Sequence, residues 1–225
     1  MIIEARHNGP PGSGNGGYTA GLVAAAAGAP HGPLEVTLRV PPPLETPLSV
    51  VLSDGGLQVR DEDRLVAEAR ATPAPDAAVP AVPLGLAATA ARAYPGLREH
   101  PFPTCYVCGP RRPDGDGLRI FPGPLPDGRT AAPWTVPADV SPATVWAALD
   151  CPGGWAVLAP GRPYVLGRIT AVVRSVPRPG QRCVVVGAAT ASAGRKAEVD
   201  TSLYGPDGRL LAAARAVWIA LPEQS

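Results

Sequence analysis

The spacing of apolar residues between positions 15 and 71 predicts one helix followed by four short strands. Within residues 15–28, Tyr18, Leu22 and Ala26 share one helix face, and the glycine and proline after them would end the helix. Residues 34–40 alternate apolar and polar side chains with the period of two that is typical of a half-buried strand. Further short strands are predicted at 48–53, 57–60 and 64–71.

A similar order of elements recurs in the second half of the chain. The pattern predicts a hairpin of 118–121 with 130–136, a helix from about Pro142 to Leu149, and strands at 164–176, 182–192, 196–204 and 209–221. One helix followed by a run of antiparallel strands, twice, indicates an α+β fold and not a parallel βαβ fold.

We therefore interpret the chain as two copies of one unit, residues 1–72 and 114–225. The segment between them, 73–113, is rich in proline and alanine, and we predict a linker with a short helix at about 84–93. Gly16-Gly17-Tyr18 in the first copy and Gly153-Gly154-Trp155 in the second are interpreted as matching helix starts. Two copies that face each other would form a site where they meet.

Composition narrows the classes of function. The chain has 225 residues, 45% of them apolar, which is enough for a sizeable core. Its net charge of +1 gives no electrostatic case for nucleic acid or an anionic membrane as a partner. We find no signal peptide or membrane span, and four cysteines in a chain of this length argue against a disulfide scaffold. We expect a cytoplasmic protein.

Several short motifs, in their order and spacing, resemble one known family. They are Asp116-Gly117-Leu118-Arg119, Asp127-Gly128-Arg129, Trp146 to Asp150, Gly194-Arg195-Lys196 and Asp207 to Ala212. Together they resemble the hotdog-fold acyl-CoA thioesterases, particularly the phenylacetate-pathway type. The resemblance implies a double hotdog, in which one continuous antiparallel sheet wraps two long helices. It also implies an acyl-CoA substrate and no cofactor beyond the coenzyme A that the substrate carries, and it leaves open whether two chains pair as a homodimer.

The resemblance divides the site residues between the two copies. The family's helix-start motif is present as Asn15-Gly16-Gly17, but the carboxylate that should follow on that helix falls on Ala24. In the second copy, Asp150 holds the carboxylate position, while Ser141-Pro142-Ala143 replaces the motif. This complementary loss predicts one composite active site and one degenerate site.

The chemistry of such a site is physically reasonable. A helix start offers unpaired N–H groups and a positive dipole end to a developing oxyanion, and glycine lets a carbonyl approach. Asp150, in an apolar setting, would act as the general base or the nucleophile. We expect its carboxylate about 5–8 Å from the Gly17 amide, across a cleft that holds the thioester and a water.

Purely structural interpretations of these residues remain open beside the catalytic one. Asn15-Gly16-Gly17 also suits a simple helix cap, and Asp150 could end a helix before Cys151-Pro152. The alternative function is a catalytically inactive protein that binds acyl-CoA or lipid in an apolar slot.

A hotdog hydratase needs an aspartate five residues before a histidine, and none of the three histidines has one. Residues 12–17 match a dinucleotide fingerprint, but no buried strand precedes them.

Two further clusters could bind ligands. Cys105-Tyr-Val-Cys108-Gly resembles half of a zinc site, but only His100, Cys151 and Cys183 offer further ligands. Free thiols at a linker turn are therefore favoured, and we predict no metal site. Gly194-Arg195-Lys196, which holds the only lysine of the chain, is expected at a hairpin turn, where it could bind the phosphates of coenzyme A or simply be solvated.

Overall fold

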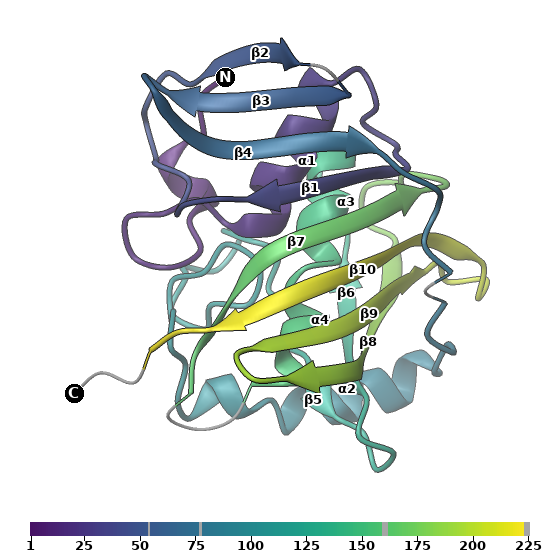
Figure 1. Cartoon of the computed structure of the whole chain (residues 1–225). Helices are drawn as coiled ribbons and strands as arrows, with labels where there is room; N and C mark the ends of the chain where they lie inside the picture. The colour runs from purple at the N-terminus through teal and green to yellow at the C-terminus, as the bar shows by residue number, and fades with distance from the viewer. Residues whose placement is uncertain (54, 77, 159–161, 223–225) are drawn as a thin grey trace.

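The computed structural model describes residues 1–53, 55–76, 78–158 and 162–222. A single antiparallel sheet curves across the molecule, and the helices pack against one of its faces (Figure 1). The helical elements are η1 (Ala5–His7), α1 (Gly16–Ala26), α2 (Leu84–Arg92), η2 (Pro95–Leu97), α3 (Pro142–Ala148) and α4 (Cys151–Trp155). The strands are β1 (Leu34–Leu38), β2 (Ser49–Ser53), β3 (Gly56–Asp61), β4 (Arg64–Ala71), β5 (Gly123–Pro124), β6 (Thr130–Thr135), β7 (Tyr164–Val173), β8 (Arg182–Ala193), β9 (Lys196–Tyr204) and β10 (Leu210–Ala220).

The order of strands across the sheet relates the two halves of the chain. The ten described strands run β2-β3-β4-β1-β7-β10-β9-β8-β6-β5, and every neighbouring pair is antiparallel. β1 and β7 join the halves, with Leu34 opposite Ala171 and Val36 opposite Ile169. On either side of this junction the order is the same, so β1 to β4 occupy places that correspond to β7 to β10. The continuous sheet and the helix-then-strands order expected from the sequence are both present.

Small residues bring the two central helices close together. The N-terminal end of α1 lies beside the C-terminal end of α3, and a Cβ at Gly21 would come within 2.6 Å of the Ala143 Cα. Trp146 and Leu149 are fully buried beneath the sheet, and burial of a leucine side chain stabilises a fold by roughly 1.5–3 kcal/mol. No helix among the described residues is long and apolar enough to cross a membrane.

Two local expectations were wrong, and the first is the strand predicted at 118–121. Residues 118–121 form no strand, because the N–H groups of Leu118 and Ile120 bond to carbonyls of Tyr106 and Val107 instead of to a neighbouring strand. The hairpin consists of β5 and β6, around the expected turn at Gly128.

The match between Gly16-Gly17-Tyr18 and Gly153-Gly154-Trp155 is also wrong as a pair of helix starts. Gly153 and Gly154 lie inside α4, the short helix that follows α3 after a break. A Cβ at Gly153 would come within 2.6 Å of Val199 Cγ2, and one at Gly154 within 2.5 Å of the Trp218 ring. Glycine is needed there because α4 packs tightly against the sheet.

The segment predicted as a linker is more than a connection. It contains α2, as expected at about 84–93, and α2 packs against β6 at the far end of the sheet (Figure 1). Its last part places Cys105 and Cys108 in the interior of the molecule.

Candidate functional site

Asn15 caps α1 and also reaches across to the second half of the chain. Its Oδ1 accepts a hydrogen bond from the Tyr18 N–H at 2.8 Å, which satisfies one of the unpaired donors at the helix start. Its Nδ2 donates to Asp150 Oδ2 at 3.0 Å. The two interpretations of Asn15, as a cap and as a site residue, are therefore compatible in one side chain.

Asp150 lies at the break between α3 and α4. Pro152 explains the break, because proline at the second position of α4 cannot continue a hydrogen-bonded helix through this point. Asp150 as a whole residue is 2% exposed. Oδ2 accepts hydrogen bonds from the Gly17 N–H and Asn15 Nδ2, each at 3.0 Å, whereas Oδ1 has no hydrogen-bond partner among the described residues.

Burial changes the acidity of this carboxyl group. Desolvation raises the pKa of Asp150 to about 7, although the hydrogen bond from Gly17 works in the opposite direction. A carboxyl group with its pKa near neutrality exchanges protons readily at physiological pH, as a general base must.

The contact between Asp150 and Gly17 is closer than the 5–8 Å expected from the sequence. The Gly17 N–H bonds directly to Oδ2, so there is no cleft between them. The reason is steric: Gly17 has no side chain, and a Cβ there would come within 2.6 Å of Asp150 Cβ. At the same helix start the Gly16 N–H has no hydrogen-bond partner among the described residues, so it is a free donor.

A pocket opens beside Asp150 and the start of α1. It encloses about 440 Å³ of space not filled by protein atoms, including its opening to solvent. Asn15, Gly16 and Asp150 lie in its wall. Much of the remaining lining is apolar, from the start of β7, the end of α4 and the residues after it, the end of β10 and the loop before Cys105, namely Pro101, Phe102, Trp155, Leu158, Tyr164, Val165, Leu166 and Trp218. The chemistry of this lining suits an apolar ligand with one polar group at Asp150.

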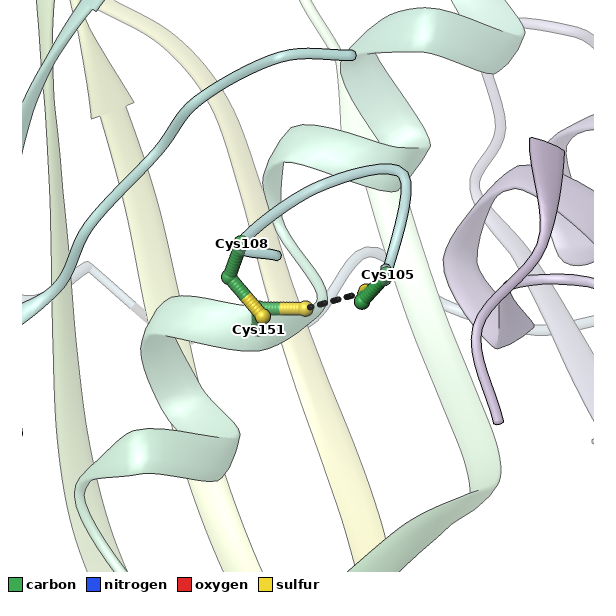
Figure 2. A group of neighbouring side chains, drawn as sticks. All are labelled: Cys105, Cys108 and Cys151. Atoms are coloured by element: carbon green, nitrogen blue, oxygen red, sulfur yellow. Dashed lines mark hydrogen bonds between the residues drawn. The ribbon is translucent and has the colours of Figure 1, made fainter. Parts of the chain in front are cut away.

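The pocket wall also contains a group of three thiols whose proximity could not be predicted from the sequence. Cys105 and Cys108 come from the Cys-x-x-Cys turn, and Cys151 follows Asp150 at the start of α4 (Figure 2). Cys183, the other soft candidate, is buried on β8 and is not a member of the group. Only the folded chain brings Cys151 to the turn, because 46 positions separate it from Cys105.

The Gly194-Arg195-Lys196 turn joins β8 to β9, as expected, and is exposed. The Arg195 Nε donates to the Ala220 carbonyl at 3.0 Å, and Ala220 pairs with Tyr164 of the pocket wall. The turn therefore lies at the pocket end of the sheet without lining the pocket. Sequence reasoning missed Arg162, which donates to the Gly194 carbonyl at 3.1 Å and adds a third cation to this edge.

The degenerate site expected at Ser141-Pro142-Ala143 and Ala24 has fewer groups that could take part in catalysis. The Ser141 hydroxyl is engaged in a capping box with Thr144 at the start of α3, and Ala24 is a buried residue without a functional group. That only one of the two constellations works stays a prediction.

Known structures match the architecture over nearly the whole chain. A scan of protein-family models and a search of curated proteins each found no match. Among solved structures, the tesB protein of Mycobacterium avium subsp. paratuberculosis is 14% identical, with a TM-score of 0.63 over 99% of this chain and 91% of that one. A Thermobifida fusca protein described as a thioesterase II is 14% identical, with a TM-score of 0.60 over 99% and 96%.

A third solved structure describes the fold itself. It is a conserved protein of unknown function with a hot dog fold from Alicyclobacillus acidocaldarius, 15% identical, with a TM-score of 0.57 over 98% of this chain and 91% of that one. Identities this low are evidence about the fold and not about the chemistry. Together with the ten-stranded sheet around α1 and α3, they show that this chain has the double hotdog fold.

Proposed function

We propose that the chain hydrolyses acyl-CoA thioesters in the pocket beside Asn15, Gly16, Gly17 and Asp150. The observation that carries the proposal is a buried carboxylate with one oxygen held by two N–H donors and the other left without a partner. Such a group is oriented by the protein and still able to take a proton. The descriptions of two structural neighbours as a tesB protein and a thioesterase II support the same reaction class.

The proposed reaction uses the two oxygens of Asp150 differently. Oδ2 stays fixed by Gly17 and Asn15, while Oδ1 holds a water molecule and accepts its proton as the water oxygen attacks the thioester carbon. The carbonyl oxygen accepts a hydrogen bond from the free Gly16 N–H, where the dipole of α1 also favours negative charge. The carbon–sulfur bond then breaks, and the proton on Asp150 passes to the departing thiolate of coenzyme A.

The direct experiment is to monitor thiol release from a panel of acyl-CoA thioesters of short, medium and long chain and an arylacetyl-CoA. We expect turnover above the uncatalysed rate for at least one class, because the site contains both a base and an oxyanion donor. Binding of the panel without any turnover would contradict hydrolysis. That result would favour the second candidate, an inactive acyl-CoA-binding protein, whose supporting observation is that Asp150 already occupies the Gly17 N–H.

The Arg195–Lys196 turn gives a prediction about substrate binding. We expect that replacing Arg195 and Lys196 together with alanine raises KM for acyl-CoA about five- to thirtyfold, because each exposed cation contributes ~0.5–1 kcal/mol of attraction to a phosphate. The corresponding acyl-pantetheine lacks the nucleotide phosphates, so its KM should not change. An equal rise in KM for both substrates would show that the turn does not contact the phosphates.

A further inference from the structure

Three buried thiols meet in the pocket wall from two segments far apart in the chain. The sulfurs of Cys105, Cys108 and Cys151 all lie within 4.8 Å of one another, and those of Cys105 and Cys151 are 3.9 Å apart (Figure 2). Their side chains come from a turn and from the start of α4, and all three point into the same small volume. The rest of the described chain has no second group of this kind.

The spacing of the sulfurs matches that of ligands that share one ion. A tetrahedral zinc ion with zinc–sulfur bonds of about 2.3 Å places neighbouring sulfurs roughly 3.8 Å apart. A [4Fe–4S] cluster needs wider spacing, because each thiolate then binds a different iron. Soft thiolate ligands favour zinc over magnesium or calcium. We propose that Cys105, Cys108 and Cys151 together bind one Zn²⁺ ion.

The turn that carries two of the ligands is built for this spacing. The Gly109 N–H bonds to the Cys105 carbonyl at 2.9 Å and closes the turn over Cys105–Cys108. A Cβ at Gly109 would come within 2.5 Å of the Cys105 nitrogen, so only glycine allows the turn to close this tightly. The turn brings both thiols to the side that faces α4.

Hydrogen-bond donors surround the sulfurs and would stabilise the thiolate form. The Asn15 Nδ2 lies 3.9 Å from Cys105 Sγ, and the His100 Nε2 lies 3.3 Å from Cys108 Sγ. The His100 Nδ1 accepts a hydrogen bond from the Phe102 N–H at 2.8 Å, so the proton of the neutral ring is on Nε2. His100 is therefore a donor to the Cys108 sulfur and not a ligand. Three protein ligands leave a fourth position for a water molecule or another exogenous ligand.

The ion also accounts for how an irregular segment is held in the core. Residues 98–122 contain no helix or strand, yet Cys105 to Cys108 are buried in their middle. Zinc bound by the three thiols would fasten this segment to α4, next to Asp150. Asn15 contacts both Asp150 and Cys105, so the metal site adjoins the candidate active site. Metal binding is nevertheless independent of the proposed hydrolysis and is measured without it.

The proposal is tested by the metal content of the full chain. We expect protein purified under reducing conditions without chelator to contain one zinc ion per chain by mass spectrometry of the metal. After removal by chelator, Co²⁺ should restore a thiolate-to-cobalt charge-transfer band and the visible absorption of tetrahedral coordination. Cys105→Ser, Cys108→Ser and Cys151→Ser should each lose stoichiometric zinc. Cys183→Ser is the matched control, because Cys183 is an equally buried thiol outside the group, and it should keep one zinc.

A further variant tests whether His100 is a zinc ligand or only a hydrogen-bond donor to the sulfur of Cys108. His100→Gln should keep one zinc, bound about 10- to 100-fold more weakly, since it alters a hydrogen bond to a ligand and not a ligand itself. Loss of zinc as complete as in Cys108→Ser would overturn the three-thiol assignment. So would folded wild-type protein that takes up neither Zn²⁺ nor Co²⁺, or a disulfide between these cysteines in protein whose thiols were blocked at lysis. The wild-type measurements decide the question even if a serine variant fails to fold.

Discussion

Replacing Asp150 with asparagine should lower kcat/KM for thioester hydrolysis by about 100-fold or more while the fold stays intact. A factor of 100 corresponds to about 2.7 kcal/mol of lost transition-state stabilisation. The amide oxygen can still accept the hydrogen bonds from Gly17 and Asn15, so the geometry at Oδ2 is preserved. What disappears is the group that accepts the proton of the attacking water.

The measurement compares single-turnover and steady-state thiol release by the wild type and the variant, with circular dichroism as a check on the fold. Glu198→Gln is a matched control, because it makes the same chemical change at an exposed position on β9. Its activity should equal that of the wild type. Equal rates for wild type and Asp150→Asn would remove Asp150 from the mechanism and leave it as a residue that ends α3.

The architecture was accessible from the sequence because its signals are local and repeated. Alternating apolar residues predicted β1 to β4 and β6 to β10 to within a few positions, and the family resemblance implied one continuous sheet. The failures at 118–121 and at Gly153-Gly154 have a common cause. In both places contacts distant in sequence, to Tyr106 and to Trp218, decide the local conformation, and a short motif does not encode them.

The candidate site was accessible only in part. The pairing of Asn15 with Asp150 was expected from the resemblance, and the structure brings these residues together. The direct hydrogen bond to Gly17 could not be predicted, since it depends on how closely α1 and α3 approach. The meeting of Cys151 with Cys105 and Cys108 is also invisible in the sequence, because the connecting segment 98–122 has no periodic pattern from which its path could be read.

Gly17→Ala should both destabilise the fold and impair the site, because the space between α1 and α3 is already filled. The new Cβ would come within 2.6 Å of Asp150 Cβ and 2.7 Å of the Trp146 carbonyl oxygen, and a backbone atom cannot rotate away. Overpacking of this kind costs about 1–3 kcal/mol of unfolding free energy. For a chain of this size, each kcal/mol lowers Tm by roughly 2–4 °C.

The two effects of Gly17→Ala can be measured separately. Thermal unfolding followed by circular dichroism reports the stability, and thiol release at a temperature where the variant is folded reports the displacement of Asp150 from the Gly17 N–H. Gly85→Ala is the control: Gly85 lies on the exposed side of α2, and a Cβ there would meet nothing within 4 Å. Since alanine favours a helix over glycine by up to ~1 kcal/mol, this control should be slightly more stable than the wild type. If Gly17→Ala matched Gly85→Ala in both Tm and activity, the helices would have room to separate, and the close contact between Gly17 and Asp150 would not hold the carboxylate in place.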